Sequence, residues 1–294
     1  MNLQFLFAVP VLRQQQVPDV HVGQASDVWL VDTADSAVVV RRPRIHGGVL
    51  TGPFWMGCQA LFGTRPGSVS ALGATHRLLS ALATLPIPRV LDVRCAEAGP
   101  FVVVERMPGQ TLLCFADLDT RSLRWLGEAM ACWHSFSSPW YGALSAPSGQ
   151  PAQQFHPHAA AVIRQLADAL GGERDAARPW IQRALAALRE LPALSEMQLI
   201  MLDLDPTQFL HQDGALTALV DAELFALGPS ALELAALEYL LDGPAADAFR
   251  DGYERVLPLP DLSPVRLPYR CLLRLLEVQG RVDWNTWMTH PTRF

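Results

Sequence analysis

The N-terminal third of the chain alternates apolar and polar positions in short runs, which is the pattern of half-buried β-strands. Residues 27–32 (DVWLVD) and 37–41 (AVVVR) are rich in β-branched side chains and are separated by the turn-forming tetrad TADS, which predicts a β-hairpin. Two further strands are predicted at residues 89–93 and 101–105. Between the strand pairs, apolar residues recur at helical spacing over residues 71–85 and predict one helix, which a proline ends.

Three other segments of the chain carry weaker patterns. The apolar N-terminus, MNLQFLFAVPVL, is short and lacks a basic leader region, so we interpret it as a strand or core segment and not as a signal peptide. Residues 47–67 are rich in glycine and proline, so we expect them to be irregular or mobile. Residues 143–154 are low in complexity and predict a loop.

Helix-period apolar positions dominate the rest of the chain. They predict helices at residues 122–136, 157–170, 174–191, 230–241 and 269–279. Residues 198–224 interrupt this series with a strand–loop–strand–loop pattern. Strands followed by helices predict an α+β fold of two lobes. We therefore expect a β-rich N-lobe over residues 1–106 and a larger, mainly helical C-lobe over residues 107–294.

Length and composition allow a packed core and exclude some classes of function. The chain has 294 residues, of which 50% are apolar and 18% are charged, so wholesale disorder is not expected. The net charge is −6, the pI is near 5.7, and no run of Lys or Arg is present. A protein that grips a phosphate backbone usually carries a basic face, so we expect no nucleic-acid partner. The acidity fits a cationic substrate, but it fits ordinary solubility better.

Cysteine usage and the length of the apolar runs indicate a cytoplasmic protein. The five cysteines are widely scattered and form no CxxC pair, which argues against a disulfide framework and favours a reducing compartment. No apolar run reaches the roughly 18 residues that span a bilayer, so we expect no membrane association.

The strongest candidate for chemistry is residues 199–223, LIMLDLDPTQFLHQDGALTALVDAE. Asp203 follows an apolar run, where a strand would open into a loop. A short hairpin would follow, turning at residues 212–214 (QDG) and returning to Asp221. This path would bring Gln208 and Asp221 close to Asp203.

Two carboxylates and an amide at one place suit a site for phosphoryl transfer. Mg²⁺ binds oxygen ligands of this kind, usually one or two carboxylates together with nucleotide phosphates. A further acid can orient an attacking hydroxyl and accept its proton. The spacing alone is equally compatible with a structural role, in which Asp203 and Asp205 cap turns and Asp221 ends a strand.

The same segment resembles the core of the aminoglycoside phosphotransferase and choline kinase superfamily, whose fold is protein-kinase-like. The family signature is H-G-D-x-x-x-x-N, a hairpin, and a strand that ends in I-D-x-E. Here residues 201–208 read MLDLDPTQ and residues 220–223 read VDAE. Further similarities follow in the family's order: GQASDVWLV (23–31), LPIPRVL (85–91), FVVVERMPG (101–109), LGEAMACWH (126–134) and GPSALELA (228–235).

The resemblance implies a role for each candidate residue in the C-lobe. Asp203 takes the place of the catalytic aspartate, which acts as a base toward the acceptor hydroxyl. Gln208 and Asp221 take the places of the two ligands of Mg²⁺. Glu233 takes the place of a structural acid.

In the N-lobe the resemblance implies a nucleotide site. The backbone of residues Glu105, Arg106 and Met107 corresponds to the hinge that meets an adenine. Arg41 stands where the family has the lysine that holds the α- and β-phosphates. The glutamate partner of that lysine falls near Thr75, which cannot pair with a cation. Arginine can still hold phosphate in a bidentate manner, and Arg42 or Arg44 could share the task.

The catalytic loop also departs from the family pattern. Met201 and Leu202 replace His-Gly, and Gln208 replaces Asn. Glutamine keeps the oxygen ligand but lengthens its reach by one methylene, which matters for Mg²⁺ because this ion tolerates little geometric slack.

Other residues give weaker candidates. His156 and His158 are spaced H-x-H, but no third ligand is visible, so we expect no metal site there. Trp284 and Trp287 belong more simply to the core than to an acceptor pocket, the alternative that we keep open.

We therefore predict a phosphotransferase that uses ATP or GTP as co-substrate and Mg²⁺ as cofactor. Its acceptor is a hydroxyl of a small molecule: an aminoglycoside, a sugar, an amino alcohol or a biosynthetic intermediate. The alternative is a pseudokinase that keeps the fold as a binding or scaffolding protein without turnover, which the changes at Arg41, Thr75, Met201 and Gln208 suggest. A third possibility is a kinase-like protein that transfers another part of the nucleotide.

Overall fold

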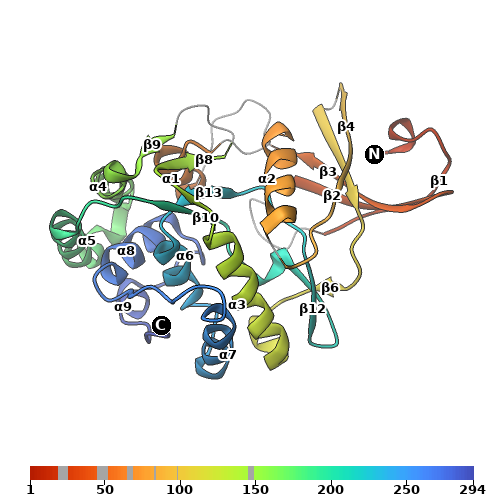
Figure 1. The fold of residues 1–294 in the computed structure, drawn as a ribbon. Helices are drawn as coiled ribbons and strands as arrows, with labels where there is room; N and C mark the ends of the chain where they lie inside the picture. Colours follow the sequence, from red (N-terminus) through yellow and green to blue (C-terminus); the bar gives the residue numbers. More distant parts are fainter. Residues whose placement is uncertain (19–25, 45–51, 65–68, 83, 98, 145–148) are drawn as a thin grey trace.

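The computed structural model describes residues 1–18, 26–44, 52–64, 69–82, 84–97, 99–144 and 149–294. Figure 1 shows a sheet with one helix beside it at one side of the molecule, and most of the helices at the other side. The α+β arrangement that the sequence predicts is therefore confirmed.

An antiparallel sheet forms most of the N-terminal part. Its strands, in order across the sheet, are β1 (Val11–Gln16), β2 (Ser26–Thr33), β3 (Ala37–Pro43), β5 (Gly99–Glu105) and β4 (Val90–Ala96). The predicted hairpin is confirmed, because β2 and β3 pair in antiparallel register with Asp32 opposite Ala37. The strands predicted at residues 89–93 and 101–105 are confirmed as β4 and β5.

Both faces of this sheet are covered by apolar side chains. On one face, Leu3 of the N-terminal segment is buried in a cluster with Phe101, which confirms that this segment belongs to the core. On the other face lies helix α2 (Val69–Leu82), whose Leu72 is buried with Val104. The helix predicted at residues 71–85 is thus confirmed, and it ends a few residues earlier than expected.

Helices dominate the C-terminal part. The predicted ones are confirmed, with shifted ends, as α3 (Thr120–His134), α4 (Phe155–Asp168), α5 (Arg174–Glu190), α6 (Ser230–Leu237) and α8 (Arg266–Leu276). Two more were not predicted: α7 (Gly243–Tyr253) and α9 (Trp284–Met288). Short 3₁₀ turns lie at η1 (Gln4–Leu6), η2 (Phe115–Asp117), η3 (Ala152–Gln154), η4 (Gly171–Glu173) and η5 (Pro206–Gln208). No helix within the described ranges is long and apolar enough to cross a membrane.

Two small antiparallel sheets lie among the helices. The first contains, in order, β7 (Ser137–Ser138), β10 (Met197–Met201), β13 (Phe225–Gly228), β8 (Trp140–Ala143) and β9 (Gln150–Pro151). The second contains β12 (Ala215–Leu219), β11 (Phe209–Gln212) and β6 (Gln110–Thr111). The predicted hairpin is confirmed as β11–β12. Asp213 and Gly214 both take positive φ angles (52° and 83°), as a tight hairpin turn requires.

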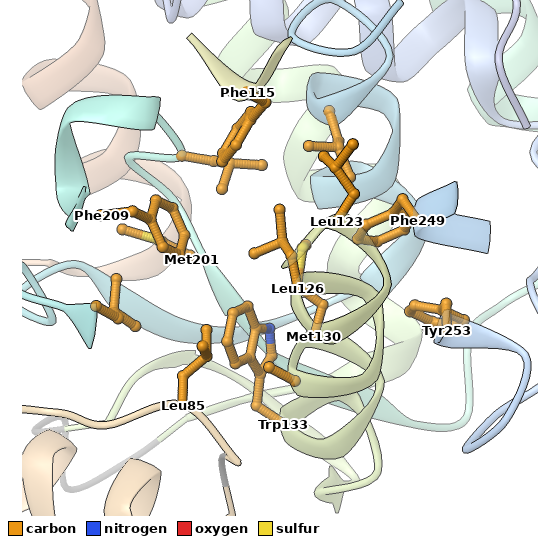
Figure 2. Close-up of a cluster of buried hydrophobic side chains, with 14 of the residues drawn as sticks. Leu85, Phe115, Leu123, Leu126, Met130, Trp133, Met201, Phe209, Phe249 and Tyr253 are labelled. Atoms are coloured by element: carbon orange, nitrogen blue, oxygen red, sulfur yellow. The ribbon is translucent and has the colours of Figure 1, made fainter. Parts of the chain in front are cut away.

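Helices α3 and α7 lie side by side (Figure 1), and two glycines allow their close approach. A Cβ on Gly127 would lie 2.1 Å from the carbonyl oxygen of Phe249, and one on Gly252 would lie 1.9 Å from that of Arg124. Figure 2 shows the core beneath α3, where Leu126, Met130 and Trp133 face Met201 and Phe209. This core therefore joins α3 directly to the strands that lead into the candidate site.

Two loop predictions are wrong in part. Within residues 47–67 the chain forms helix α1 (Pro53–Phe62), which packs against α4 and α8. Proline suits the first turn of a helix because its missing N–H needs no partner there, and Gly63 ends α1 in the left-handed conformation. Residues 47–51 and 65–67 lie outside the described residues. The segment 143–154 contains β9 and η3, and its residues 145–148 likewise lie outside the described part.

Candidate active site

Asp203 and Gln208 are brought together by a short loop after β10. The chain leaves β10 at Met201 and enters η5, which Asp205 caps by accepting hydrogen bonds from Thr207 N at 2.9 Å and from Thr207 Oγ1 at 2.5 Å. Nε2 of Gln208 then donates to Oδ2 of Asp203 at 3.2 Å. The turn-capping role that we considered for both Asp203 and Asp205 is thus observed for Asp205.

Arg41 of β3 links the N-terminal sheet to the segment that follows β12. Its Nη2 donates to Oδ2 of Asp221 at 2.8 Å and lies 3.1 Å from Oε1 of Glu223. Its Nη1 donates to the carbonyl oxygen of Val220 at 3.4 Å. The arginine side chain is 9% exposed, so this is a largely buried ion pair. Burial alone would lower the pKa of Arg41, but Asp221 and Glu223 raise it, and the guanidinium stays charged.

Sequence reasoning assigned no separate role to Glu223. The signal was present, because Glu223 is the acid of the VDAE motif and lies two positions after Asp221. The backbone N–H of Glu223 donates to Oδ1 of Asp221 at 3.4 Å, so a local turn holds the two acids close together. Arg41 accordingly contacts both carboxylates.

Negative charge exceeds positive charge in this cluster. Burial, followed by the charges of Asp221, Asp205 and Glu223, raises the pKa of Asp203 to about 7. Burial raises the pKa of Glu223 as well; Arg41 opposes that rise and Asp221 adds to it. Acids that resist ionisation in this way would be stabilised by a further cation.

The chemistry of these side chains fits Mg²⁺. Asp203, Gln208 and Asp221 offer carboxylate and amide oxygens, the hard donors that Mg²⁺ takes, and the surplus negative charge favours a divalent cation. Among the described residues, no group of three or more His, Cys, Asp or Glu side chains is arranged to hold a metal ion. Mg²⁺ would therefore need additional oxygens, which nucleotide phosphates usually supply.

A buried polar network holds the start of the loop that carries Asp203. Oε1 of Glu233, on α6, accepts a hydrogen bond from the backbone N–H of Met201 at 3.0 Å. Its Oε2 lies 2.5 Å from Nε2 of His134 and accepts a hydrogen bond from Nε1 of Trp133 at 3.4 Å. The other ring nitrogen of His134 lies 2.8 Å from the hydroxyl of Tyr253. Glu233 therefore acts as a structural acid at the position that the sequence indicated, and His134 is part of the same network.

The sequence and the fold both match known phosphotransferases. Residues 17–267 match the family described as the phosphotransferase enzyme family. The chain belongs to this family. No curated protein matches the chain.

Solved structures of similar fold include several phosphotransferases. The apoenzyme of a macrolide 2′-phosphotransferase from Brachybacterium faecium is 17% identical, with a TM-score of 0.63 over 99% of this chain and 98% of that one. A spectinomycin phosphotransferase in complex with ADP and spectinomycin is 11% identical, with a TM-score of 0.63 over 94% of this chain and 84% of that one. A wild-type aminoglycoside 2′-phosphotransferase in complex with GDP is 14% identical, with a TM-score of 0.62 over 94% of this chain and 87% of that one. The predicted two-lobed, kinase-like fold is thereby confirmed.

The family's glutamate on the N-lobe helix has no acidic replacement at the position we expected. Thr75 is buried on α2, and the next residue, His76, is buried as well. Nδ1 of His76 lies 2.6 Å from the carbonyl oxygen of Pro88. The chain therefore has no acid at the position where the resemblance led us to expect one, and Arg41 pairs with Asp221 and Glu223.

Arg42 and Arg44, at the end of β3, both form ion pairs with Asp27. Arg42 donates to Oδ2 of Asp27 through Nε at 3.2 Å and Nη2 at 2.5 Å, and Nε of Arg44 donates to Oδ1 of Asp27 at 2.8 Å. Burial opposes ionisation of Asp27, but these hydrogen bonds lower its pKa overall. In this structure Asp27 thus holds both arginines that could have shared the phosphate with Arg41.

The side chains at the predicted hinge take part in surface ion pairs. Oε2 of Glu105 accepts from Nε of Arg89 at 3.1 Å, and Nη1 of Arg106 donates to Oδ1 of Asp32 at 3.0 Å. Both pairs are solvent-exposed, so they contribute little to stability. The role that we expect for Glu105, Arg106 and Met107 concerns their backbone, and it stays a prediction.

The weaker candidates take structural positions. The hydroxyls of Tyr269 and Tyr141 lie 3.1 and 2.7 Å from ring nitrogens of His156 and His158, respectively. Trp284 and Trp287 are each 2% exposed in the core around α8, which favours the core interpretation over an acceptor pocket. The five cysteines are all free, as their spacing indicated.

Proposed function

We propose that this phosphotransferase moves the γ-phosphoryl group of ATP or GTP to a hydroxyl of a small molecule. The observation that carries the proposal is the geometry around Asp203: Gln208 donates to its carboxylate at 3.2 Å, and the neighbouring Asp221 pairs with Arg41 at 2.8 Å. Burial and the surrounding acids raise the pKa of Asp203, which favours uptake of a proton as a general base requires. Asp203 would hold the acceptor hydroxyl in line and take its proton as the bond to phosphorus forms.

The remaining charged groups would bind and neutralise the phosphates. Gln208 and Asp221 would hold Mg²⁺, which when bound would offset the charge on the phosphate oxygens. Arg41 would contact the phosphates through its guanidinium, and the backbone of residues 105–107 would meet the base. Catalysis would then depend on positioning and electrostatics, since phosphoryl transfer asks for little covalent chemistry from the protein.

The acceptor is proposed only as a class. The similar proteins include a macrolide phosphotransferase and a spectinomycin phosphotransferase, which at 17% and 11% identity support the fold and leave the substrate open. We propose an acceptor that carries a hydroxyl, such as an aminoglycoside, a sugar, an amino alcohol or a biosynthetic intermediate. A cytoplasmic location fits this role and the absence of disulfides.

One observation favours the pseudokinase alternative. Arg41 already pairs with Asp221 and Glu223, so the cation expected at the phosphates is held by the acids expected at the metal. A protein that had lost turnover could keep this ion pair as a purely structural link between its two parts. The two functions differ in whether nucleotide and Mg²⁺ can break the ion pair between Arg41 and the two acids.

Thermal-shift titration with ATP and GTP, each with and without Mg²⁺, separates these functions. A phosphotransferase should show a rise in melting temperature that depends on Mg²⁺, because only the folded state binds the nucleotide. An acceptor screen with a coupled assay for ADP or GDP would then follow. Absence of any shift at millimolar nucleotide would instead favour the pseudokinase.

A further inference from the structure

Helix α2 places a histidine on the face of the sheet that carries Arg41. Along β3, Val39 and Arg41 point to the same face because side chains alternate along a strand. Val39 packs in the apolar cluster that contains Leu72 of α2. Leu72 and His76 are both buried and lie one helical turn apart, so His76 shares the side of α2 on which Leu72 meets the sheet. His76 and Arg41 therefore lie in the same layer between helix and sheet.

Two buried atoms in this layer lack a hydrogen-bond partner. One is Nε2 of His76 and the other is Nε of Arg41. Both residues are more than nine-tenths buried. Buried polar atoms are nearly always paired, so each unpaired one calls for a reason.

The chemistry of the two atoms is complementary. The carbonyl oxygen of Pro88 can only accept a hydrogen bond, so Nδ1 of His76 must carry the hydrogen. Burial lowers the pKa of His76 overall, the hydrogen bond to Pro88 opposes this and the charge of Arg41 adds to it, so the neutral imidazole is favoured. Its Nε2 is then an acceptor, whereas Nε of arginine is only a donor.

A neutral partner suits Arg41 better than an acid would. Asp221 and Glu223 already surround the guanidinium, and a third carboxylate would raise the pKa of the neighbouring acids further. A neutral acceptor orients the planar guanidinium through Nε and leaves its positive charge, together with Nη1 and Nη2, available for an anion.

We propose that His76 is the positioning residue for Arg41 when nucleotide is bound. Arg41 leaves Asp221 for the phosphates, donates its Nε–H to Nε2 of His76, and presents Nη1 and Nη2 to phosphate oxygens. His76 thus replaces the acidic partner that this family has on the N-lobe helix. The inference rests on the proposed function, because it requires that the protein bind a nucleotide.

Two substitutions separate the two hydrogen bonds of His76. In His76→Asn, the amide nitrogen occupies the place of Nδ1 and keeps the donor for Pro88, but the acceptor at Nε2 is lost. In His76→Gln, the amide oxygen can occupy the place of Nε2, and the donor for Pro88 is lost. Ser80→Asn, at an exposed position of the same helix, controls for asparagine in α2.

Calorimetric titration of ADP and of adenosine, both with Mg²⁺, tests the inference together with the melting temperature of each variant. We expect His76→Asn to weaken ADP binding about tenfold, which corresponds to ~1.4 kcal/mol, and to leave adenosine binding unchanged. His76→Gln should keep ADP affinity within about threefold while its melting temperature falls, because it is the Pro88 bond that stabilises the fold. Ser80→Asn should change neither quantity.

The outcomes distinguish this inference from the proposed function. Wild-type affinity for ADP in His76→Asn would overturn the role of His76 and leave the proposed function standing. Equal losses for ADP and adenosine that follow the melting temperature would show a structural role only, and would also overturn it. If the wild-type protein binds neither ADP nor GDP in the presence of Mg²⁺, the proposed function fails and this inference fails with it.

Discussion

At the scale of single residues, Asp203 illustrates how a candidate catalytic group affects stability. Its pKa rises from 3.8 to about 7 on folding, so the folded protein holds a proton that the unfolded chain has lost between these values. This proton uptake contributes to the free energy of unfolding in full below pH 3.8, and the contribution is lost as the pH rises through about 7. The ionised form of Asp203 is thus costly to the fold at the pH where a base must be ionised to act.

Asp203→Asn should therefore stabilise the protein while it removes activity. Without nucleotide, we expect a higher melting temperature than wild type at pH 8, and a difference that shrinks as the pH falls toward 4, because wild-type Asp203 then becomes neutral too. We expect kcat to fall by at least ~100-fold, the usual contribution of a general base. Thermal melts across this pH range and an initial-rate assay measure the two effects. A melting temperature below that of wild type at pH 8 would contradict the burial of charge described here.

At the scale of elements, the loop that carries Asp203 is held by helix α6, whose Glu233 lies 32 residues beyond Met201 along the chain. Strand β10 ends where Glu233 of α6 accepts the N–H of Met201, and α3 reaches the same carboxylate through His134. The sequence could predict Glu233 because a short motif marks its place. It could not predict the pairing with His134, because the two residues meet only when α3 and α6 pack together.

Two substitutions of Glu233 should separate the contribution of its charge to stability from the contribution of its hydrogen bonds. Glu233→Gln keeps the shape and an oxygen for Met201, so we expect a loss of about 1–2 kcal/mol in unfolding free energy. Glu233→Leu leaves the N–H of Met201 and Nε2 of His134 without a partner, and we expect a loss of about 3–5 kcal/mol. Urea denaturation of both variants measures these values. Equal losses in the two variants would mean that the network contributes little beyond its volume.

At the scale of the whole molecule, the sequence predicted those elements whose local pattern and tertiary setting agree. The β2–β3 hairpin has β-branched strands and turn residues, and α3 has a clear apolar period, so both were found. Helix α1 was missed because the glycines and prolines in and around it suggest a loop, whereas packing against α4 and α8 determines its structure. Helix α7 was missed because the glycine and proline at its start, Gly243 and Pro244, suggest a turn. The Arg41–Asp221 pair joins residues 180 positions apart, and no local pattern contains such a contact.

Helix α1 also connects the global packing to the candidate site, which leads to a prediction about Cys58. Cys58 is 1% exposed, and burial together with the charge of Asp203 raises the pKa of its thiol, so its side chain lies near the catalytic loop. The preceding residue, Gly57, allows α1 to pack this closely against α8, since a Cβ there would lie 2.1 Å from Cδ2 of Leu276. In the native protein we expect a thiol reagent at pH 8 to modify the exposed Cys95 and Cys114 quickly and Cys58 very slowly.

Gly57→Leu should displace α1 from α8 and expose the thiol of Cys58 to the reagent. Because the new side chain cannot fit beside Leu276, we expect a loss of about 1–3 kcal/mol in unfolding free energy and rapid modification of one further thiol. Gly172→Leu is the matched control, because a Cβ at Gly172 meets no atom within 4 Å. Mass spectrometry of the modified protein identifies which cysteine reacts. Suppose instead that Cys58 stays protected in Gly57→Leu and that the variant is as stable as wild type. The close approach of Gly57 to Leu276 would then not be what holds α1, and with it Cys58, beside Asp203.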